Sequence, residues 1–182
     1  MPGCEVRIMD DGGNPSPADE TGEIVVRGPQ VMMGYWDQPE ATAEVLSDGW
    51  LKTGDVRRLD EEGYLFLQDR KKDVIVNLGR NVYPAMVENV LQKHPAVAAS
   101  AVIGVPDPET GEAVKAIVVL NDHQRASEEE LLAFCEDKLG EHQRPVSVDF
   151  VDALPRNAMG KILKRVLREP YWRGHERQIG SV

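Results

Sequence analysis

The pattern of apolar and polar positions in residues 1–71 predicts short strands separated by turns. Val6–Met9 and Glu23–Arg27 are rich in β-branched residues, and a run of Asp, Gly, Asn and Pro lies between them. This is the composition of two strands joined by a turn. Tyr64–Leu67 follows the glycine-ended turn 60–63 and has the composition of a further strand. The first part of the chain is therefore predicted to be β-rich.

After about residue 72 the pattern changes to alternating strands and helices. Val74–Val76 is predicted to begin a hairpin that turns at Gly79. Pro84 has the fixed φ angle that suits the first turn of a helix. Apolar residues spaced three and four apart extend the predicted helix over residues 85–93.

Three further strands and a helix are predicted between residues 97 and 151. The strands are expected at 97–105, 113–120 and 147–151, and the first is so uniformly apolar that it is predicted to be central in its sheet. Ser127 is predicted to cap a helix, with Glu130 at the capping-box position.

The change of pattern at residue 72 divides the chain into two predicted domains. Residues 1–71 form the β-rich domain, and residues 72–182 form an α+β domain with a hairpin and a short sheet flanked by helices. No apolar run reaches the length that a membrane-spanning helix requires.

Charge and cysteine content exclude several classes of function. The net charge of −10 argues against nonspecific nucleic-acid binding, because neutralising phosphates requires a surplus of Lys and Arg. Cys4 and Cys135 are too few for a disulfide framework and lack the spacing of metal ligands, so no metal site is expected. The expected compartment is the reducing cytoplasm.

The stretch LPRNAMGKILKRVLREPYW, residues 154–172, places Lys161 after Gly160 and before a short predicted helix that is expected to be basic on its outer face. Position 155 is Pro where a phosphate-binding loop requires Gly, so the stretch is not such a loop. Gly160 permits a positive φ and close approach to a ligand. The residues alone leave two interpretations open, a solvated surface lysine or a cation presented to another pocket.

Five segments occur in an order that resembles a known family. They are TGEIVVRGPQVMMGYW, DGWLKTGDVRRLDEEGYLFLQDRKKDVIV, GRNVYPAMVE, VIGVPD and LPRNAMGKILKRVLRE. Together they resemble the C-terminal part of the AMP-forming acyl-CoA synthetases, within the adenylate-forming ligase superfamily. The resemblance covers residues 2–170. It implies that residues 1–71 belong to the distorted barrel of a large domain and that residues 72–182 are the small C-terminal lid domain.

The resemblance implies roles for four residues in the family's reaction. Asp55, in a TGD segment, accepts hydrogen bonds from the ribose hydroxyls of ATP, and Arg70 lies near the same ribose. Lys72 is the hinge about which the small domain turns. Lys161 bridges the attacking carboxylate and the α-phosphate as an acyl-adenylate forms and pyrophosphate leaves.

The resemblance also implies a second step in which the hairpin around Gly79 lines a tunnel for the thiol. CoA attacks the adenylate to give a thioester and AMP. Many family members have Ser-Gly-Gly at this turn, whereas this chain has Asn77, Leu78 and Gly79. The implied substrates are a carboxylic acid, ATP and CoA, with Mg²⁺ in the full-length parent enzyme. The identity of the acid is left open.

The family's phosphate loop and its Tyr-Gly-x-Thr-Glu segment do not occur in residues 1–182. The chain is therefore expected to be a C-terminal fragment of a ligase and inactive by itself. A non-catalytic module that binds a nucleotide or a partner, and one half of a split ligase, remain alternatives. Strands that normally pair with missing ones are expected to expose Val6, Ile8, Ile24 and Val26, and to drive homodimerisation or association.

Overall fold

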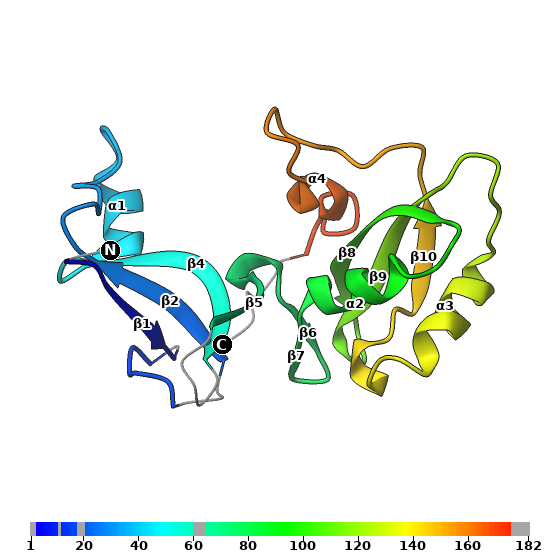
Figure 1. Cartoon of the computed structure of the whole chain (residues 1–182), viewed down its shortest axis with the longest axis horizontal. Helices are drawn as coiled ribbons and strands as arrows, with labels where there is room; N and C mark the ends of the chain where they lie inside the picture. Colours follow the sequence, from blue (N-terminus) through cyan, green and yellow to red (C-terminus); the bar gives the residue numbers. More distant parts are fainter. Residues whose placement is uncertain (1–2, 11, 18–20, 60–64, 176–182) are drawn as a thin grey trace. The chain divides into compact units, whose positions relative to one another are not determined.

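The structure is a computed structural model that describes residues 3–10, 12–17, 21–59 and 65–175. The chain divides between Lys71 and Lys72 into two compact units, and the described strands form one sheet in each (Figure 1). A short 3₁₀ helix, η1 (Lys71–Asp73), spans the point of division.

The first unit contains a mainly antiparallel sheet and one short helix. Its elements are β1 (Glu5–Met9), β2 (Thr21–Arg27), α1 (Pro39–Val45), β3 (Leu46–Ser47), β4 (Trp50–Leu59) and β5 (Leu65–Arg70). The order is β1-β2-β4-β3, and β5 also pairs with β4. The strands predicted at Val6–Met9 and Glu23–Arg27 are confirmed. The predicted Tyr64–Leu67 strand matches β5 from Leu65 on, and Tyr64 and the turn before it lie outside the described residues.

Buried apolar side chains lie on both faces of this sheet. Ile8 is 5% exposed and shares one face with Ile24, whereas Val25 and Val56, which are 6% and 0% exposed, lie on the opposite face. The prediction that Ile8 is exposed is wrong, because Ile8 is almost fully buried where it pairs opposite Ile24 on β2. Val6 is 49% exposed, as expected for an edge strand.

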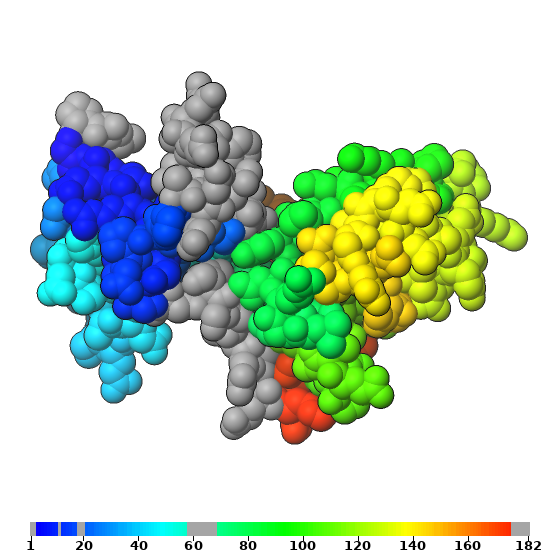
Figure 2. All heavy atoms as spheres, turned by 90° about the horizontal axis from the view of Figure 1, so that it is seen from below, coloured from blue at the N-terminus to red at the C-terminus, as the bar shows by residue number. Residues whose placement is uncertain are grey.

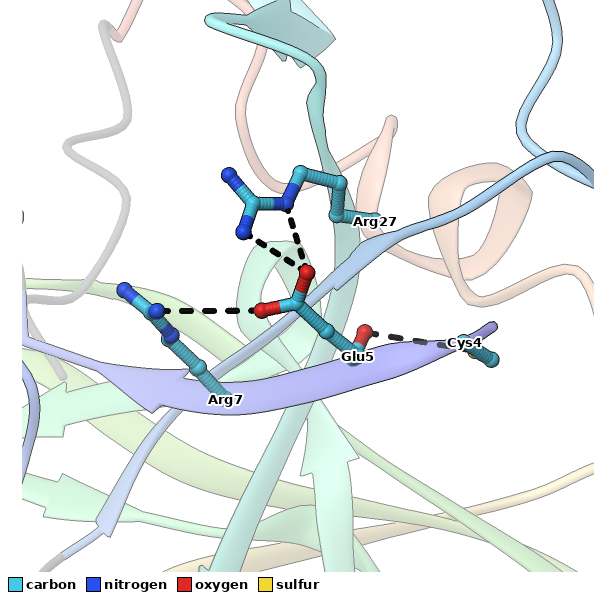
Figure 3. Close-up of polar contacts among 4 residues, drawn as sticks. All are labelled: Cys4, Glu5, Arg7 and Arg27. Carbon is cyan, nitrogen blue, oxygen red and sulfur yellow. Dashed lines mark hydrogen bonds and ion pairs between the residues drawn. The ribbon is translucent and has the colours of Figure 1, made fainter. Parts of the chain in front are cut away.

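Polar contacts join the edge strand β1 to β2 on the face that also carries Val25. Figure 3 shows the Glu5 carboxylate between two guanidinium groups. One oxygen accepts two hydrogen bonds from Arg27, at 3.0 and 2.7 Å, and the other lies 3.8 Å from Arg7. Both guanidinium groups also lie over the ring of Trp50, 4.5 and 4.6 Å from its centroid. These groups cover the apolar face of Trp50 with charge.

The second unit is an α+β layer. Its elements are β6 (Ile75–Asn77), β7 (Arg80–Val82), α2 (Pro84–Leu91), β8 (Val97–Asp107), β9 (Gly111–Leu120), α3 (Glu128–Glu136), the 3₁₀ helix η2 (Glu141–Gln143), β10 (Ser147–Phe150) and α4 (Lys164–Arg168). Strand β9 pairs antiparallel with β8 and parallel with β10. The β6–β7 hairpin joins β9 through the single pair Asn77 and Gly111.

The predicted central position of residues 97–105 is wrong. Within the described sheet β9 is central, and β8 pairs only with β9. The apolar run is buried because β8 has packed side chains on both faces. Val102 joins a core with α2 and α3, whereas Ala101 and Ile103 join a second core with Leu154, and Ile162 packs against it.

Local signals placed the helices correctly. Pro84 occupies the first turn of α2, and Val87 and Leu91 face the core. Ser127 caps α3, where its side chain accepts a hydrogen bond from the Glu130 N–H at 3.2 Å. The predicted α+β fold, with a hairpin and a short sheet flanked by helices, is confirmed.

Candidate functional site

A bulge in β4 sets the position of Asp55. In the pairing of β2 with β4, Glu23 lies opposite Val56 and Val25 lies opposite Lys52. The intervening segment of β4, residues 53–55, therefore opposes Ile24 alone. Gly54 adopts a φ of 72°, a left-handed conformation that favours glycine. The TGD segment thus projects from the regular strand.

The structure brings Asp55 and Arg70 together. The two residues are direct partners in the pairing of β4 with β5, and Arg70 Nε lies 3.5 Å from Asp55 Oδ1. Their side chains are 34% and 45% exposed. An ion pair this exposed contributes only about 0–1 kcal/mol to folding, so its polar atoms are available to a ligand at little cost in stability.

Glu23 supports this segment and was not predicted from the sequence. Its side chain is buried, with Oε1 accepting the Gly54 N–H at 3.0 Å and Oε2 lying 3.4 Å from Lys71 Nζ. A carboxylate at an inward-facing strand position is a signal that could have identified it, because a buried charge requires partners. Glu23 therefore fixes both the TGD bulge and the last residue of the first unit.

The loop that carries Lys161 is folded around the side chain of Asn157. Asn157 Oδ1 accepts hydrogen bonds from the N–H groups of Met159 and Lys161, at 3.0 and 2.9 Å. The Asn157 N–H donates to the Lys161 carbonyl at 2.9 Å. Gly160 completes the turn with a φ of 79°. Asparagine commonly organises turns in this way, so Asn157 is a residue that turn chemistry could have identified.

The Lys161 side chain extends from this loop into solvent. Within the part of the chain that the structure describes, its ammonium group makes no hydrogen bond or ion pair. Met159 beside it is 92% exposed. The loop therefore holds the Lys161 backbone firmly while its charge can reach a separate group.

The helix after this loop differs from its predicted character. A basic outer face was expected, yet the side chains of Lys164 and Arg168 are only 13% and 10% exposed. Lys164 lies 2.8 Å from Glu88, and Arg168 lies 2.9 Å from Asp73. The apolar Val166 is instead 42% exposed. Arg165 is exposed as predicted, whereas the burial of Lys164 and Arg168 could not be predicted from the helix pattern because their partners are distant in sequence.

The segment beyond α4 is also held on the sheet. Tyr171 donates a short hydrogen bond to the carboxylate of Asp149, which lies 2.7 Å from Lys115 Nζ. Burial, together with this hydrogen bond and the charge of Asp149, raises the pKa of Tyr171 to about 12. Trp172 Nε1 donates to the Gly104 carbonyl at 2.9 Å. The helix after Lys161 is therefore fixed from both ends.

The hairpin that contains Gly79 turns through two residues. Leu78 and Gly79 have φ values of 52° and 68°, and the flanking pair is Asn77 with Arg80. Two positive φ angles define a type I′ turn, which is unusual for leucine. The Leu78 N–H donates to the Thr110 carbonyl at 2.9 Å. The side chain of Leu78, at the tip of this hairpin, is 60% exposed. The β6–β7 hairpin lies near the lower edge of Figure 1, and Figure 2 shows the molecule from below.

The predicted site residues thus lie in two groups. Asp55 and Arg70 form a pair in the first unit, whereas Lys72, Gly79 and Lys161 lie in the second. Among the described residues, no group of three or more His, Cys, Asp or Glu side chains is placed to hold a metal ion. No described helix is long and apolar enough to cross a membrane.

Two family descriptions match the chain. Residues 86–161 match the AMP-binding enzyme C-terminal domain, and residues 1–36 match the AMP-binding enzyme family. A feruloyl-CoA synthase from an Amycolatopsis species is 52% identical over 167 residues, which are 92% of this chain and 34% of that protein. A long-chain-fatty-acid–CoA ligase from Yersinia pestis is 50% identical over 169 residues, 93% of this chain and 30% of the ligase.

A solved structure shows the same arrangement of elements. ATP-bound MatB from Rhodopseudomonas palustris aligns with a TM-score of 0.89 and 40% identity, over 97% of this chain and 35% of that protein. This chain therefore spans about a third of the length of the relatives it matches. By sequence and by fold, the chain belongs to the AMP-binding enzymes, the adenylate-forming family that includes the acyl-CoA ligases.

Proposed function

We propose that residues 1–182 supply the C-terminal part of an ATP-dependent, AMP-forming acid–thiol ligase. In the first half-reaction a carboxylate oxygen attacks the α-phosphate of ATP, the bond between the α- and β-phosphates breaks, and pyrophosphate leaves. In the second, the sulfur of CoA attacks the acyl carbon and AMP leaves. The named relatives support this reaction class, since they are CoA synthases and ligases that differ in their acid. The proposal accordingly leaves the acid open.

Asp55 and Arg70 are proposed to hold the ribose of the nucleotide. An ionised carboxylate only accepts hydrogen bonds and can take both ribose hydroxyls at once. Arg70, 3.5 Å away, orients that carboxylate and offers donors to ring or hydroxyl oxygens. The donor and acceptor set therefore fits a ribose. The proposal assigns Mg²⁺ no residue in this chain.

The observation that carries the proposal is the loop of Lys161. Asn157 fixes the Lys161 backbone with hydrogen bonds in both directions, while the ammonium group remains exposed. This geometry supports presentation of the ammonium group to a separate binding pocket. We assign Lys161 to the first half-reaction, where its charge stabilises the negative charge that gathers between the carboxylate and the α-phosphate.

The remaining assignments concern movement and the thiol. Lys72 is the proposed hinge, because it lies where the two units meet along the chain. The hairpin at Gly79 is proposed to line the path of CoA, and its exposed turn supports this role. We further propose that the isolated chain lacks ligase activity and associates through β1, where Val6 is exposed. Cys4 and Cys135 are both free thiols, which supports a cytoplasmic setting.

A direct test follows the products made by the natural protein that carries these residues. It should convert ATP to AMP and pyrophosphate in the presence of a matching acid, and form a thioester when CoA is added. A panel of aromatic, dicarboxylic and fatty acids covers the chemistry of the acid. Release of ADP and phosphate, or nucleotide binding without turnover for every acid, would contradict the proposal.

A further inference from the structure

The side chain of Arg168 reaches from α4 to the backbone at the start of the second unit. Its Nη1 donates to the Lys72 carbonyl at 3.0 Å, and its Nη2 lies 2.9 Å from Asp73 Oδ1. Arg168 and Asp73 are only 9% and 8% exposed. One guanidinium group therefore holds both the main chain of one residue and the side chain of the next, a geometry that its planar fork permits.

The helix that provides Arg168 is itself fixed to the body of the second unit. Lys164, one helical turn earlier, lies 2.8 Å from Glu88 on α2. The same Glu88 oxygen accepts the Val102 N–H of β8 at 2.7 Å. The contact between Arg168 and residues 72–73 therefore joins the start of the second unit to a rigid part of its core, and to the helix that directly follows the Lys161 loop.

The carbonyl contact restricts where the chain can bend. The Lys72 carbonyl belongs to the peptide plane that links Lys72 to Asp73, and that plane is held by Arg168. Rotation about bonds after the plane is therefore opposed by a buried, charge-assisted hydrogen bond. Rotation about the two backbone bonds at the Lys72 Cα, or about backbone bonds of earlier residues, leaves the hydrogen bond between Arg168 and the Lys72 carbonyl intact. The bend is thus confined to Lys72 and the residues before it.

We propose that Arg168 is a positioning residue that sets the end of the hinge at Lys72. This inference rests on the proposed function, because it takes Lys72 as the pivot of the small domain. With a fixed pivot, the Lys161 loop and the Gly79 hairpin move with one rigid body. If the bend could shift to residues after Lys72, the Lys161 loop would be misplaced in the first half-reaction and the Gly79 hairpin in the second. Arg168 therefore affects both half-reactions without touching a substrate.

Amide hydrogen exchange on the 182-residue chain tests the contact and requires no ligase activity. The variant Arg168→Lys keeps a charge that can pair with Asp73, but it loses the guanidinium fork whose two nitrogens separately reach the Lys72 carbonyl and Asp73. We expect exchange at residues 72–74 to become about tenfold faster or more, the effect of losing one hydrogen bond from a charged donor. Arg165→Lys is the matched control, since Arg165 is exposed on the same helix.

Two exchange results would overturn the inference. Equal exchange at residues 72–74 in both variants would mean that Arg168 does not restrain the hinge. A rise spread evenly over the second unit would mean that Arg168 only stabilises the fold. Failure of the proposed function would not alter either measurement, so the two failures are distinguishable.

A kinetic measurement on the active enzyme separates positioning from stability. Arg168→Lys should lower kcat for adenylation and for thioester formation by a similar factor, about tenfold, with the KM for ATP unchanged. The nucleotide contacts of Asp55 and Arg70 belong to the first unit and are not altered. A raised KM for ATP with kcat unchanged would overturn the assignment.

Discussion

The position of Asp55 is set by the backbone conformation of β4, and its side chain is not buried. Three residues of β4 oppose one of β2, Gly54 has a left-handed φ, and the buried Glu23 carboxylate accepts the Gly54 N–H. These features project Asp55 toward Arg70 on the neighbouring strand. The pair contributes little to stability, so changes at Asp55 report mainly on ligand binding.

The first prediction concerns Asp55→Asn in the active enzyme. The substitution keeps the shape of the side chain but replaces the charged carboxylate, which is proposed to accept hydrogen bonds from both ribose hydroxyls, with a neutral amide. We expect ATP binding to weaken by about 1.5–3 kcal/mol, and calorimetric titration with ATP measures it. Asp48→Asn is the control, because Asp48 is an exposed turn residue of the same unit. Unchanged ATP affinity in Asp55→Asn would reject the ribose assignment.

Leu78 is a second residue with an unusual backbone conformation, and it lies in the hairpin that is proposed to line the path of CoA. Its φ of 52° costs leucine roughly 1–2 kcal/mol relative to an ordinary backbone conformation. Asparagine tolerates this conformation better and is preferred in type I′ turns before glycine. Its side chain is 60% exposed, so burial does not explain the choice of leucine. Strain of this kind is often retained where a side chain has a task.

Leu78→Asn should therefore raise the free energy of unfolding by about 0.5–1 kcal/mol in urea denaturation, through relief of strain. In the active enzyme the same variant should slow thioester formation and leave adenylation unchanged, because the hairpin is assigned to the thiol path. A variant that is less stable, or that slows adenylation alone, would contradict this account of the turn.

At the scale of elements, the β6–β7 hairpin is supported by the turn between β8 and β9. The Thr110 carbonyl accepts the Leu78 N–H at 2.9 Å, and Asp107 Oδ1 accepts both the N–H and the Oγ1–H of Thr110, at 2.8 and 2.9 Å. These hydrogen bonds, led by the one from the Thr110 backbone, hold the pKa of Asp107 below its ordinary value. The charged form of Asp107 is therefore favoured by folding.

The pH dependence of this turn follows from the sign of that shift. Because the folded pKa is the lower one, Asp107 stabilises the fold fully above its unfolded pKa of about 4 and loses this effect as the pH falls through the folded pKa. In urea denaturation, the stability difference between wild type and Asp107→Asn should be constant from pH 5 to 7 and shrink at lower pH. A difference that grows on acidification would show that the sign is wrong.

Elements specified by local chemistry could be predicted from the sequence. The turn at Gly79, Pro84 at the start of α2 and the Ser127 cap each rely on neighbouring residues alone. The position of β8 in its sheet could not be predicted, because its apolar run is buried by packing on both faces. The contacts of Arg168 could not be predicted either, because its partners, residues 72–73, lie at the other end of the second unit's sequence.

In the candidate site, too, sequence motifs identified candidate residues but not the tertiary contacts that position them. The motif that contains Asp55 identified the residue, but not the bulge that projects it or Glu23 that supports the bulge. Likewise Lys161 was identified by its motif, whereas the role of Asn157 became apparent from the hydrogen bonds of the folded loop. The residues proposed to act on a substrate lie in recognisable motifs, whereas the residues that support them depend on the tertiary structure.

At the scale of the whole molecule, the proposed function divides its groups between two units. The nucleotide pair Asp55 and Arg70 belongs to one unit, and Lys161 belongs to the other. Under the proposed function, the second unit delivers Lys161 to the nucleotide during the first half-reaction. The proposal therefore limits the contribution of Lys161 to that half-reaction, whereas Asp55 and Arg70 are proposed to hold the nucleotide in both.

The most direct test is a pair of single-turnover assays on Lys161→Ala in the active enzyme, with Arg165→Ala as a control of equal charge change. Pyrophosphate release should fall by about 10²–10³, the usual cost of removing one preorganised electrostatic group. Thioester formation from supplied acyl-adenylate should stay close to wild type, as should both steps in Arg165→Ala. Equal loss in both half-reactions of Lys161→Ala, or no loss in either, would contradict the account.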